Sequence, residues 1–232
     1  MSYKVPKNLL SIGLDAKTVK GEKMGWTTAI LYLAPFTMNS KGINLCPHAS
    51  EGCASACLFT AGRGSFSNVM NSRINKTEYF THNRQGFLAQ LRTEIEKLRK
   101  KHGESLAIRL NGTSDIRWEK FKIDGLSLME TFPDVQFYDY TKNPKRFNNL
   151  PENYSLTFSR SESNEESALS LVSQGIANSA IVFDRIPETY KDLPVYNGDD
   201  TDLRFLDPKG VIVGLKAKGK ARKDLSGFVV NA

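Results

Sequence analysis

Short apolar runs that end in polar residues recur along this chain of 232 residues, and they limit its possible folds more than any other feature. The runs are TTAILYLAP from Thr27, LAIRLN from Leu106, VQFYDY from Val135, YSLTFS from Tyr154, AIVFD from Ala180 and VIVGLK from Val211. Each has the length and composition of a buried strand. Helical segments separate several of them, and strand–helix–strand alternation is typical of parallel sheets. We therefore predict an α/β fold, a partial (β/α) barrel of about six mostly parallel strands.

Three helices are predicted between these strands. Apolar residues recur at helical spacing over 84–102, and a further helical region covers 66–83. In SNEESALSLVSQG, Ser163 and Glu166 have the spacing of a capping box, and Gly175 is suited to end the helix. No repeat or long linker divides the chain, so we expect residues 1–232 to form a single domain.

The composition is that of an ordinary soluble protein, with 40% hydrophobic and 25% charged residues. The N-terminus lacks the apolar core of a signal peptide, and no apolar stretch approaches the roughly 18 residues of a membrane span. A cytoplasmic protein without membrane contact is the expectation. No Walker A motif and no convincing Ser/His/Asp triad is present, which argues against P-loop nucleotide hydrolysis and triad hydrolysis.

All three cysteines lie within twelve residues, in a loop over 44–64 that follows the first apolar run. Cys46, Cys53 and Cys57 form the pattern C-x6-C-x3-C. An odd, local cluster does not resemble a disulfide framework, whereas thiolates are preferred ligands of zinc, Cu(I) and iron–sulfur clusters. A buried cysteine can also be a simple small hydrophobe, an alternative that is less attractive for three than for one.

Two kinds of metal site are compatible with this loop. A zinc site could add His48, although structural zinc sites usually space their ligands as two pairs. A [4Fe-4S] cluster usually takes four thiolates, so three would leave one iron open to a small molecule. We favour the cluster and keep zinc as the alternative.

A strand followed by a three-cysteine loop at the top of a partial barrel resembles the radical S-adenosylmethionine superfamily. The resemblance implies that the open iron of a [4Fe-4S] cluster binds the amino and carboxylate groups of S-adenosylmethionine. Electron transfer then cleaves the sulfonium to a 5′-deoxyadenosyl radical, which calls for a reductant protein. The usual spacing of the superfamily is C-x3-C-x2-C, and this chain departs from it.

The whole chain is also similar to an uncharacterised bacteriophage family, the gene product eighty-eight family. The similar segments include LLSIG, KTVKGEKMGW, CPHASEGCASAC, TAGRG, RLNGTSDIRWE, FPDVQFYDYTK, LTFSRSE, DLRFLDPKG and VGLKAKGKARKDLSGFVV. This resemblance implies a protein of the host cytoplasm and gives no settled activity. Some members carry only a vague replication-associated label.

A related phage family with a radical S-adenosylmethionine-like barrel has segments similar to NGTSD, YDYTK and LTFSRSE, in that order. This resemblance implies that the motif over 111–115 lies where the superfamily holds the methionine amino group. It also implies that Ser159 and Ser161 lie near the ribose. The residues so assigned to the cofactor are Asn111, Gly112, Thr113, Ser114, Asp115, Ser159 and Ser161.

Polar residues gather where the predicted strands end, and barrel enzymes carry their active sites at that edge. The simpler alternative is that strands end in polar surface loops everywhere. On the last strand Val211, Val213 and Leu215 share one face, and Ile212, Gly214, Lys216 and Lys218 share the other. If the first face packs on helices, the two lysines point toward the mouth of the barrel. Lys142, Lys216 and Lys218 would then offer charge to a substrate carboxylate or phosphate.

The chain carries 32 Lys and Arg against 25 Asp and Glu, a net charge of +7 and a pI near 9.2. The C-terminal segment KAKGKARKD could bind a nucleic-acid backbone, or it could be a solvated basic surface. Our leading hypothesis is an iron–sulfur enzyme of the radical S-adenosylmethionine type with an unidentified substrate. The alternative is a phage nucleic-acid-binding or replication-associated protein whose cysteine loop is structural, with bound zinc or a cluster.

Overall fold

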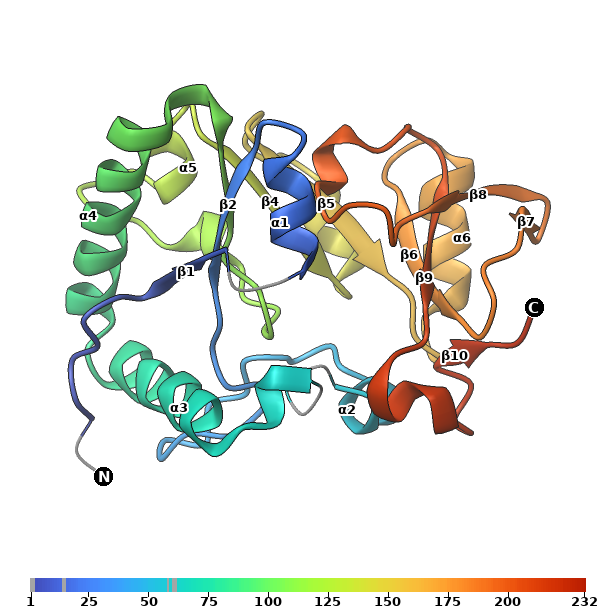
Figure 1. The fold of residues 1–232 in the computed structure, drawn as a ribbon, viewed down its shortest axis with the longest axis horizontal. Helices are drawn as coiled ribbons and strands as arrows, with labels where there is room; N and C mark the ends of the chain where they lie inside the picture. Colours follow the sequence, from blue (N-terminus) through green and yellow to red (C-terminus); the bar gives the residue numbers. More distant parts are fainter. Residues whose placement is uncertain (1–2, 14–15, 58, 60–61) are drawn as a thin grey trace.

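The computed structural model describes residues 3–13, 16–57, 59 and 62–232. Within them one mixed sheet has the order β1-β2-β3-β4-β5-β6-β9-β8-β7, with β10 beside β6 (Figure 1). The strands are β1 (Leu10–Ile12), β2 (Thr27–Leu31), β3 (Leu106–Arg109), β4 (Gln136–Thr141), β5 (Tyr154–Ser159), β6 (Ser179–Phe183), β7 (Thr189–Tyr190), β8 (Leu193–Asn197), β9 (Ile212–Lys216) and β10 (Val229–Val230). The sheet does not close on itself, because β1 and β7 lie at its two edges.

The six predicted strands are β2 to β6 and β9, and each is parallel to its neighbour. The prediction of a mostly parallel α/β sheet is therefore confirmed. Four further strands were not predicted: β8 and β10 extend the parallel pairing, and β1 and β7 add antiparallel edges. Three of these four have only two or three residues, too few to show a period in the sequence.

The α-helices are α1 (Ala16–Glu22), α2 (Glu51–Ser55), α3 (Ser67–His82), α4 (Arg84–His102), α5 (Leu128–Thr131) and α6 (Glu165–Ser173). Helix α4 has the predicted bounds and α3 differs from its prediction by a residue at each end. The capping box at α6 is wrong, because the helix begins after Asn164 and that residue makes no side-chain cap. Its amide oxygen instead accepts a hydrogen bond from the Ser161 N–H at 2.6 Å. Gly175 has the positive φ expected just after the helix.

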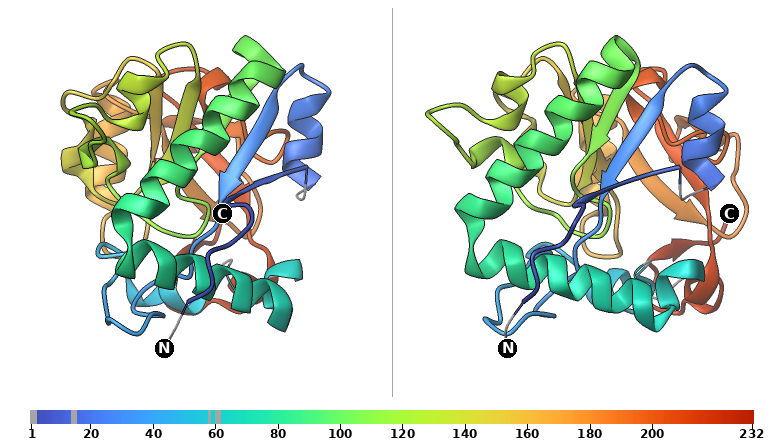
Figure 2. Two further views of the ribbon diagram at one scale, coloured as in Figure 1. Left: turned by 90° about the vertical axis from the view of Figure 1, so that its left-hand side faces the viewer. Right: turned by 60° about the vertical axis from the view of Figure 1, so that its left-hand side comes forward.

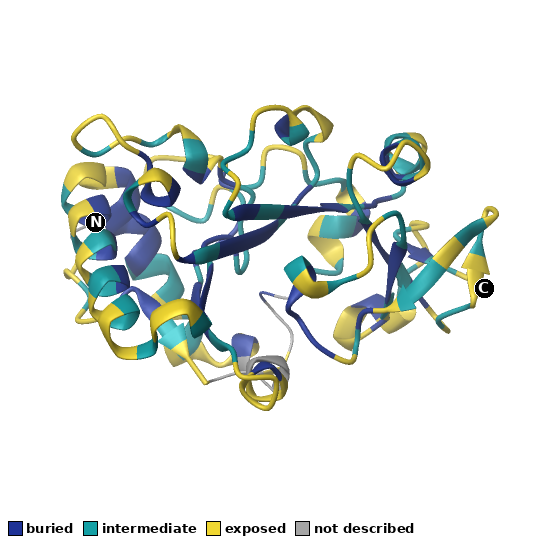
Figure 3. Cartoon of the chain, turned by 90° about the horizontal axis from the view of Figure 1, so that it is seen from above, coloured by how far each residue is buried: buried dark blue, intermediate teal, exposed yellow. Residues whose placement is uncertain are grey.

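The main core lies between the sheet and α4, which covers one face of it (Figure 2). Leu91 and Ile95 of α4 pack in the same buried cluster as Leu106 and Ile108 of β3. The central strands are buried, while the outward sides of the helices are exposed (Figure 3). Helix α3 lies beyond the carboxyl end of β2, on the same side of the molecule as α2 (Figure 1).

The predicted orientation of the last strand is wrong. Ile212 packs with Ile181 of β6 and Val172 of α6, so the face that also holds Gly214 and Lys216 is the helix-covered one. A two-residue period shows which residues share a face but not which face meets the helices. Only the neighbouring elements decide that.

The opposite, concave face of the sheet is occupied by the segment 199–207. Asp202 forms an ion pair with Arg109 of β3 at 2.7 Å. The ring of Phe205 lies against those of Trp26 and Tyr138, with centroid separations of 4.8 and 5.4 Å. This segment therefore packs across the sheet from the first strands to the last.

Candidate metal centre

The cysteine loop begins where β2 ends, and hydrogen bonds connect its first residues to the loop that follows β3. Three hydrogen bonds make the connection: Gly112 N–H to the Leu31 carbonyl (3.0 Å), the Thr113 hydroxyl to the Leu33 carbonyl (2.5 Å), and Asp115 N–H to the Leu45 carbonyl (2.8 Å). The Cys46 thiol in turn lies 3.8 Å from the Thr113 carbonyl oxygen, as a weak donor. The 111–115 motif and the first cysteine are thus held in contact by backbone groups. Residues 58, 60 and 61 of the predicted loop lie outside the described residues.

The second cysteine lies on α2, whose start is fixed from the loop after β5. The Ser50 hydroxyl accepts a hydrogen bond from Cys53 N–H, which caps the helix, and donates one to Glu162 at 2.8 Å. The same carboxylate accepts from Gly52 N–H at 2.8 Å. Burial alone would raise the pKa of Glu162, but these donors bring it below its ordinary value. Glu162, which we did not predict as a site residue, therefore anchors the cysteine helix as an anion.

The three thiols share one electrostatic environment. Burial raises the pKa of Cys46 to about 12, and the nearby Cys57, Asp115 and Cys53 add to the rise. Burial also raises the pKa of Cys57, with Cys53 adding to the shift and with Arg73 and Lys142 opposing it. Cys53 and Cys57 thus lie close enough to Cys46 to raise its pKa, and all three cysteines are half-buried and free of disulfides. Among the described residues, no group of three or more His, Cys, Asp or Glu side chains has the arrangement of a metal-ion site.

The side chain of Asn111 holds the 111–115 motif in its conformation through hydrogen bonds to the same loop. Its amide oxygen accepts three hydrogen bonds, from the Ser114 hydroxyl, Ile116 N–H and the Trp118 indole N–H, at 2.8 to 3.0 Å. Its side chain is buried and fully engaged in the loop. Gly112 permits the close approach to β2, since a Cβ there would lie 2.6 Å from the Tyr32 ring.

Asp115 connects the motif to the loop after β4. One of its oxygens accepts from Lys142 N–H at 2.9 Å, and the other from Arg146 at 3.0 Å. Arg146 is completely buried and also bonds Glu119 at 2.8 Å. Nothing in the sequence distinguished Arg146 from the surrounding basic residues, because its burial depends on the loops after β3 and β4 meeting beside Tyr154 of β5.

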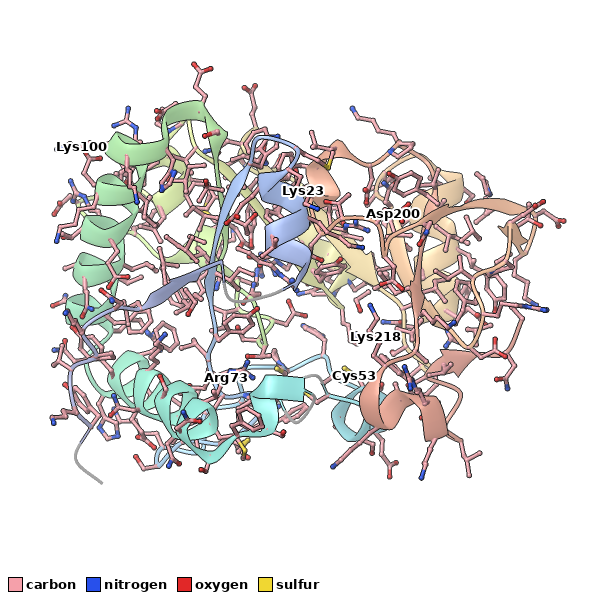
Figure 4. All side chains as sticks on the ribbon, in the orientation of Figure 1. Lys23, Cys53, Arg73, Lys100, Asp200 and Lys218 are labelled. Carbon is pink, nitrogen blue, oxygen red and sulfur yellow. The ribbon has the colours of Figure 1, made fainter. Side chains whose placement is uncertain are left out.

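Two cations lie near the thiols. Lys142 donates to the Ser159 hydroxyl at 2.6 Å, and its ammonium lies 5.7 Å from the Phe228 ring centre. Arg73 of α3 stacks on Tyr32 at 4.7 Å and on Phe59 at 5.5 Å. Figure 4 shows Arg73 and Cys53 on the same side of the molecule. Arg73 was not predicted, since on a polar helix it looks like any solvated arginine.

The remaining predicted residues lie in other settings. Ser161 is fully buried, and its hydroxyl bonds that of Ser163 at 3.3 Å, near the start of α6. Lys216 and Lys218 are both held to Asp199, the first through its backbone N–H and the second by an ion pair of 2.7 Å. Among the predicted residues, the structure therefore connects Cys46 to the 111–115 motif, that motif to Lys142, and Lys142 to Ser159.

Comparison with known proteins gives one relationship. The family model described as Gene product 88 matches residues 8–232. No curated protein and no solved structure matches the chain, so the resemblance to radical S-adenosylmethionine proteins stays a prediction. No helix among the described ranges is long and apolar enough to cross a membrane. Since the match spans the sheet from β1 to β10 and the whole cysteine loop, the chain belongs to the Gene product 88 family.

Proposed function

We propose that this protein is an iron–sulfur enzyme that binds a [4Fe-4S] cluster through Cys46, Cys53 and Cys57 and uses S-adenosylmethionine on a further substrate. The observation that carries the proposal is that all three cysteines lie on one loop, which hydrogen bonds join to the loops that follow β3 and β5. Six parallel strands in chain order support a partial barrel of the radical S-adenosylmethionine type, with its site at the carboxyl ends.

The donor chemistry suits such a group, although the three thiols do not have the arrangement of a metal-ion site in the described residues. Thiolates suit iron–sulfur clusters, and a coordinated thiol is deprotonated, so binding would overcome the raised pKa of Cys46 and Cys57. Three thiolates leave one iron open. When bound, the cluster supplies the electron that cleaves the sulfonium of S-adenosylmethionine.

The chain's own residues would hold the amino acid part of that cofactor. Once Cys46 is a thiolate, its S–H donor is gone, and the Thr113 carbonyl oxygen is left to accept a hydrogen bond from an ammonium group. The side chains of Asn111 and Ser114 keep this carbonyl in place, with Gly112 allowing the close approach. Lys142 offers a cation to a carboxylate or phosphate, and Ser159 holds its ammonium in position.

The other assignments are proposals of the same kind. Asp115 positions the backbone of Lys142, and Ser161 would act near the ribose only through the loop that it stabilises. Lys216 lies on the helix-covered face of β9, so only Lys218, which follows the strand, would serve a substrate that extends beyond the cofactor. A reductant protein would supply the electron.

The alternative function is a nucleic-acid-binding protein whose cysteine loop is purely structural and holds zinc or a cluster. The observation that favours it is the exposed basic segment over 216–223. In that case oligonucleotide affinity would fall steeply with salt, and would not respond to reduction or to S-adenosylmethionine.

Anaerobic purification followed by iron, sulfide and zinc analysis tests the proposal. We expect about four irons and four sulfides per chain, their loss in Cys46→Ser, and normal content in Glu51→Gln, an exposed control change on α2. A reduced sample should then convert S-adenosylmethionine to 5′-deoxyadenosine. Stoichiometric zinc without sulfide would refute the cluster, and a full cluster without 5′-deoxyadenosine would refute the enzyme.

A further inference from the structure

The basic segment, residues 216–223, lies directly against the cysteine loop. Its Ala217 and Ala221 are buried in one apolar cluster with Ala56, which precedes Cys57 in the chain. The cationic residues between and after these alanines, Lys218, Lys220, Arg222 and Lys223, are exposed. The alanines thus fix the segment to the loop while the charges face solvent. If the segment were only a solvated basic surface, its alanines would not need to pack against the cysteine loop.

A hollow of about 280 Å³ lies where α2 meets the basic segment. It is lined by Ser55, Ala56, Lys220, Lys223, Asp224, Leu225 and Ser226. The ammonium groups of the two lysines and the hydroxyl of Ser55 are donors of the kind that proteins use for phosphate oxygens. The carboxylate of Asp224 is engaged, since it accepts from the Ser226 hydroxyl at 2.7 Å and from Val229 N–H at 3.0 Å. With two lysines against one aspartate, the hollow therefore has a net positive charge, which suits a phosphate group.

The residues around the hollow indicate the size of the ligand that it could bind. The concave face of the sheet is occupied by the segment 199–207, whose Asp202 already pairs with Arg109. Figure 4 shows Arg73, Cys53 and Lys218 in the same lower half of the molecule, so two cations lie on the side that carries the cysteine loop. A ligand that meets the hollow and both of these cations lies across the rim and carries several negative charges in a row.

We propose that the basic segment and its hollow bind the phosphodiester backbone of a single-stranded nucleic acid and present one nucleotide to the cysteine loop. A single strand is favoured over a duplex because a stacked, paired base cannot reach a reactive centre. The role of the strand as substrate rests on the proposed function, whereas its binding does not. An acidic protein is the competing occupant of the same charges.

The test is fluorescence anisotropy of the full-length protein with labelled single-stranded DNA and RNA, at several salt concentrations. The Lys220→Glu/Lys223→Glu variant removes two cations of the hollow. Its matched control is Lys100→Glu/Lys101→Glu, the same change of charge at the exposed end of α4, far from the loop (Figure 4). Thermal unfolding of each variant checks that it folds.

We expect the hollow variant to lose at least about tenfold in affinity and to reduce the salt slope by about two, as for two lost phosphate contacts. The control should lose less than about threefold, because its charges act only at long range. Equal losses in both variants, or no binding at all, would overturn the proposal. So would polyglutamate that competes as well as an oligonucleotide of equal charge, since it would indicate an acidic protein partner.

Iron and sulfide are measured on the same samples, so the two proposals fail separately. A protein without cluster that binds oligonucleotide through Lys220 and Lys223 refutes the proposed function and supports the binding site. A protein with a full cluster and no oligonucleotide binding refutes the binding site alone. For the substrate role, we expect the oligonucleotide to raise 5′-deoxyadenosine formation in the native chain but not in the hollow variant.

Discussion

Two groups of charges lie near the cysteine loop, and they differ in burial and in partners. Around Arg146 the charges are buried and paired, with Asp115 and Glu119 both bonded to one guanidinium that has no exposed surface. Along the basic segment the charges are exposed, and the ion pair of Lys218 with Asp199 is half open to water. Buried pairs fix geometry because breaking them is costly, whereas exposed charges are free to meet a ligand. The buried group thus fixes the positions of the loops around the cysteines, and the exposed group is available to contact a ligand.

The largest effect should come from replacing Arg146 by Met. The change removes the buried cation from Asp115 and Glu119, while Glu119 keeps a second ion pair, with the exposed Arg117 at 3.3 Å. Losing one partner of a buried ion pair costs about 3–5 kcal/mol. Urea unfolding would measure the loss of stability. The matched exposed residue is Arg222, and Arg222→Met should stay within about 0.5 kcal/mol. Equal effects at the two arginines would remove the distinction between the two groups.

The second test concerns Asp139, which is buried beside the same network and is bonded by Asn111 N–H and the Tyr154 hydroxyl. Burial raises its pKa to about 7, partly opposed by Arg109. The folded protein therefore binds a proton that the unfolded chain releases above about pH 4. This contribution to stability is complete below pH 4 and is lost as the pH rises through 7.

Urea unfolding from pH 4.5 to 7.5 measures this linkage as the difference between the native protein and Asp139→Asn. The native protein should lose up to about 1.4 kcal/mol per pH unit relative to the variant. A difference that does not change with pH would mean that Asp139 stays ionised in the fold.

A smaller effect is expected for Glu162→Gln. Glutamine keeps one acceptor oxygen but loses the charge and the second acceptor, so either Gly52 N–H or the Ser50 hydroxyl loses its partner. We expect a loss of about 1–2 kcal/mol in urea unfolding, together with a lower metal content. Glu166→Gln, an exposed change on α6, is the control and should alter neither. Unchanged metal content in Glu162→Gln would show that the cysteine helix holds its place without this anchor.

The smallest effect should be that of Lys218→Ala. Its ion pair with Asp199 is partly exposed, so the loss of stability should be below about 1 kcal/mol and should vanish in high salt. Measuring unfolding at low and high salt checks this. A loss that persists in high salt would place Lys218 with the buried group.

The sequence predicted the parts of this fold in which the pattern is local and repeated. Helix α4 was found with its bounds, because apolar residues at helical spacing continue over five turns. The capping box at α6 failed because Asn164 had a competing partner, the backbone of Ser161, that no spacing rule reveals. Of the candidate site, the cysteines were identified from residue type and the 111–115 motif from a family resemblance, whereas Glu162, Arg146 and Arg73 were not identified.

The amino-acid sequence by itself determined the six parallel strands, the long helices and the single loop that holds every thiol, because these depend on neighbours in the chain. Only the tertiary structure decided which face of β9 meets the helices, which charges are buried, and that segment 199–207 covers the concave face. Those outcomes are set by contacts between residues tens of positions apart. The sequence does not show whether a charged side chain is exposed to water or buried in an ion pair. That depends on partners that are distant in the chain.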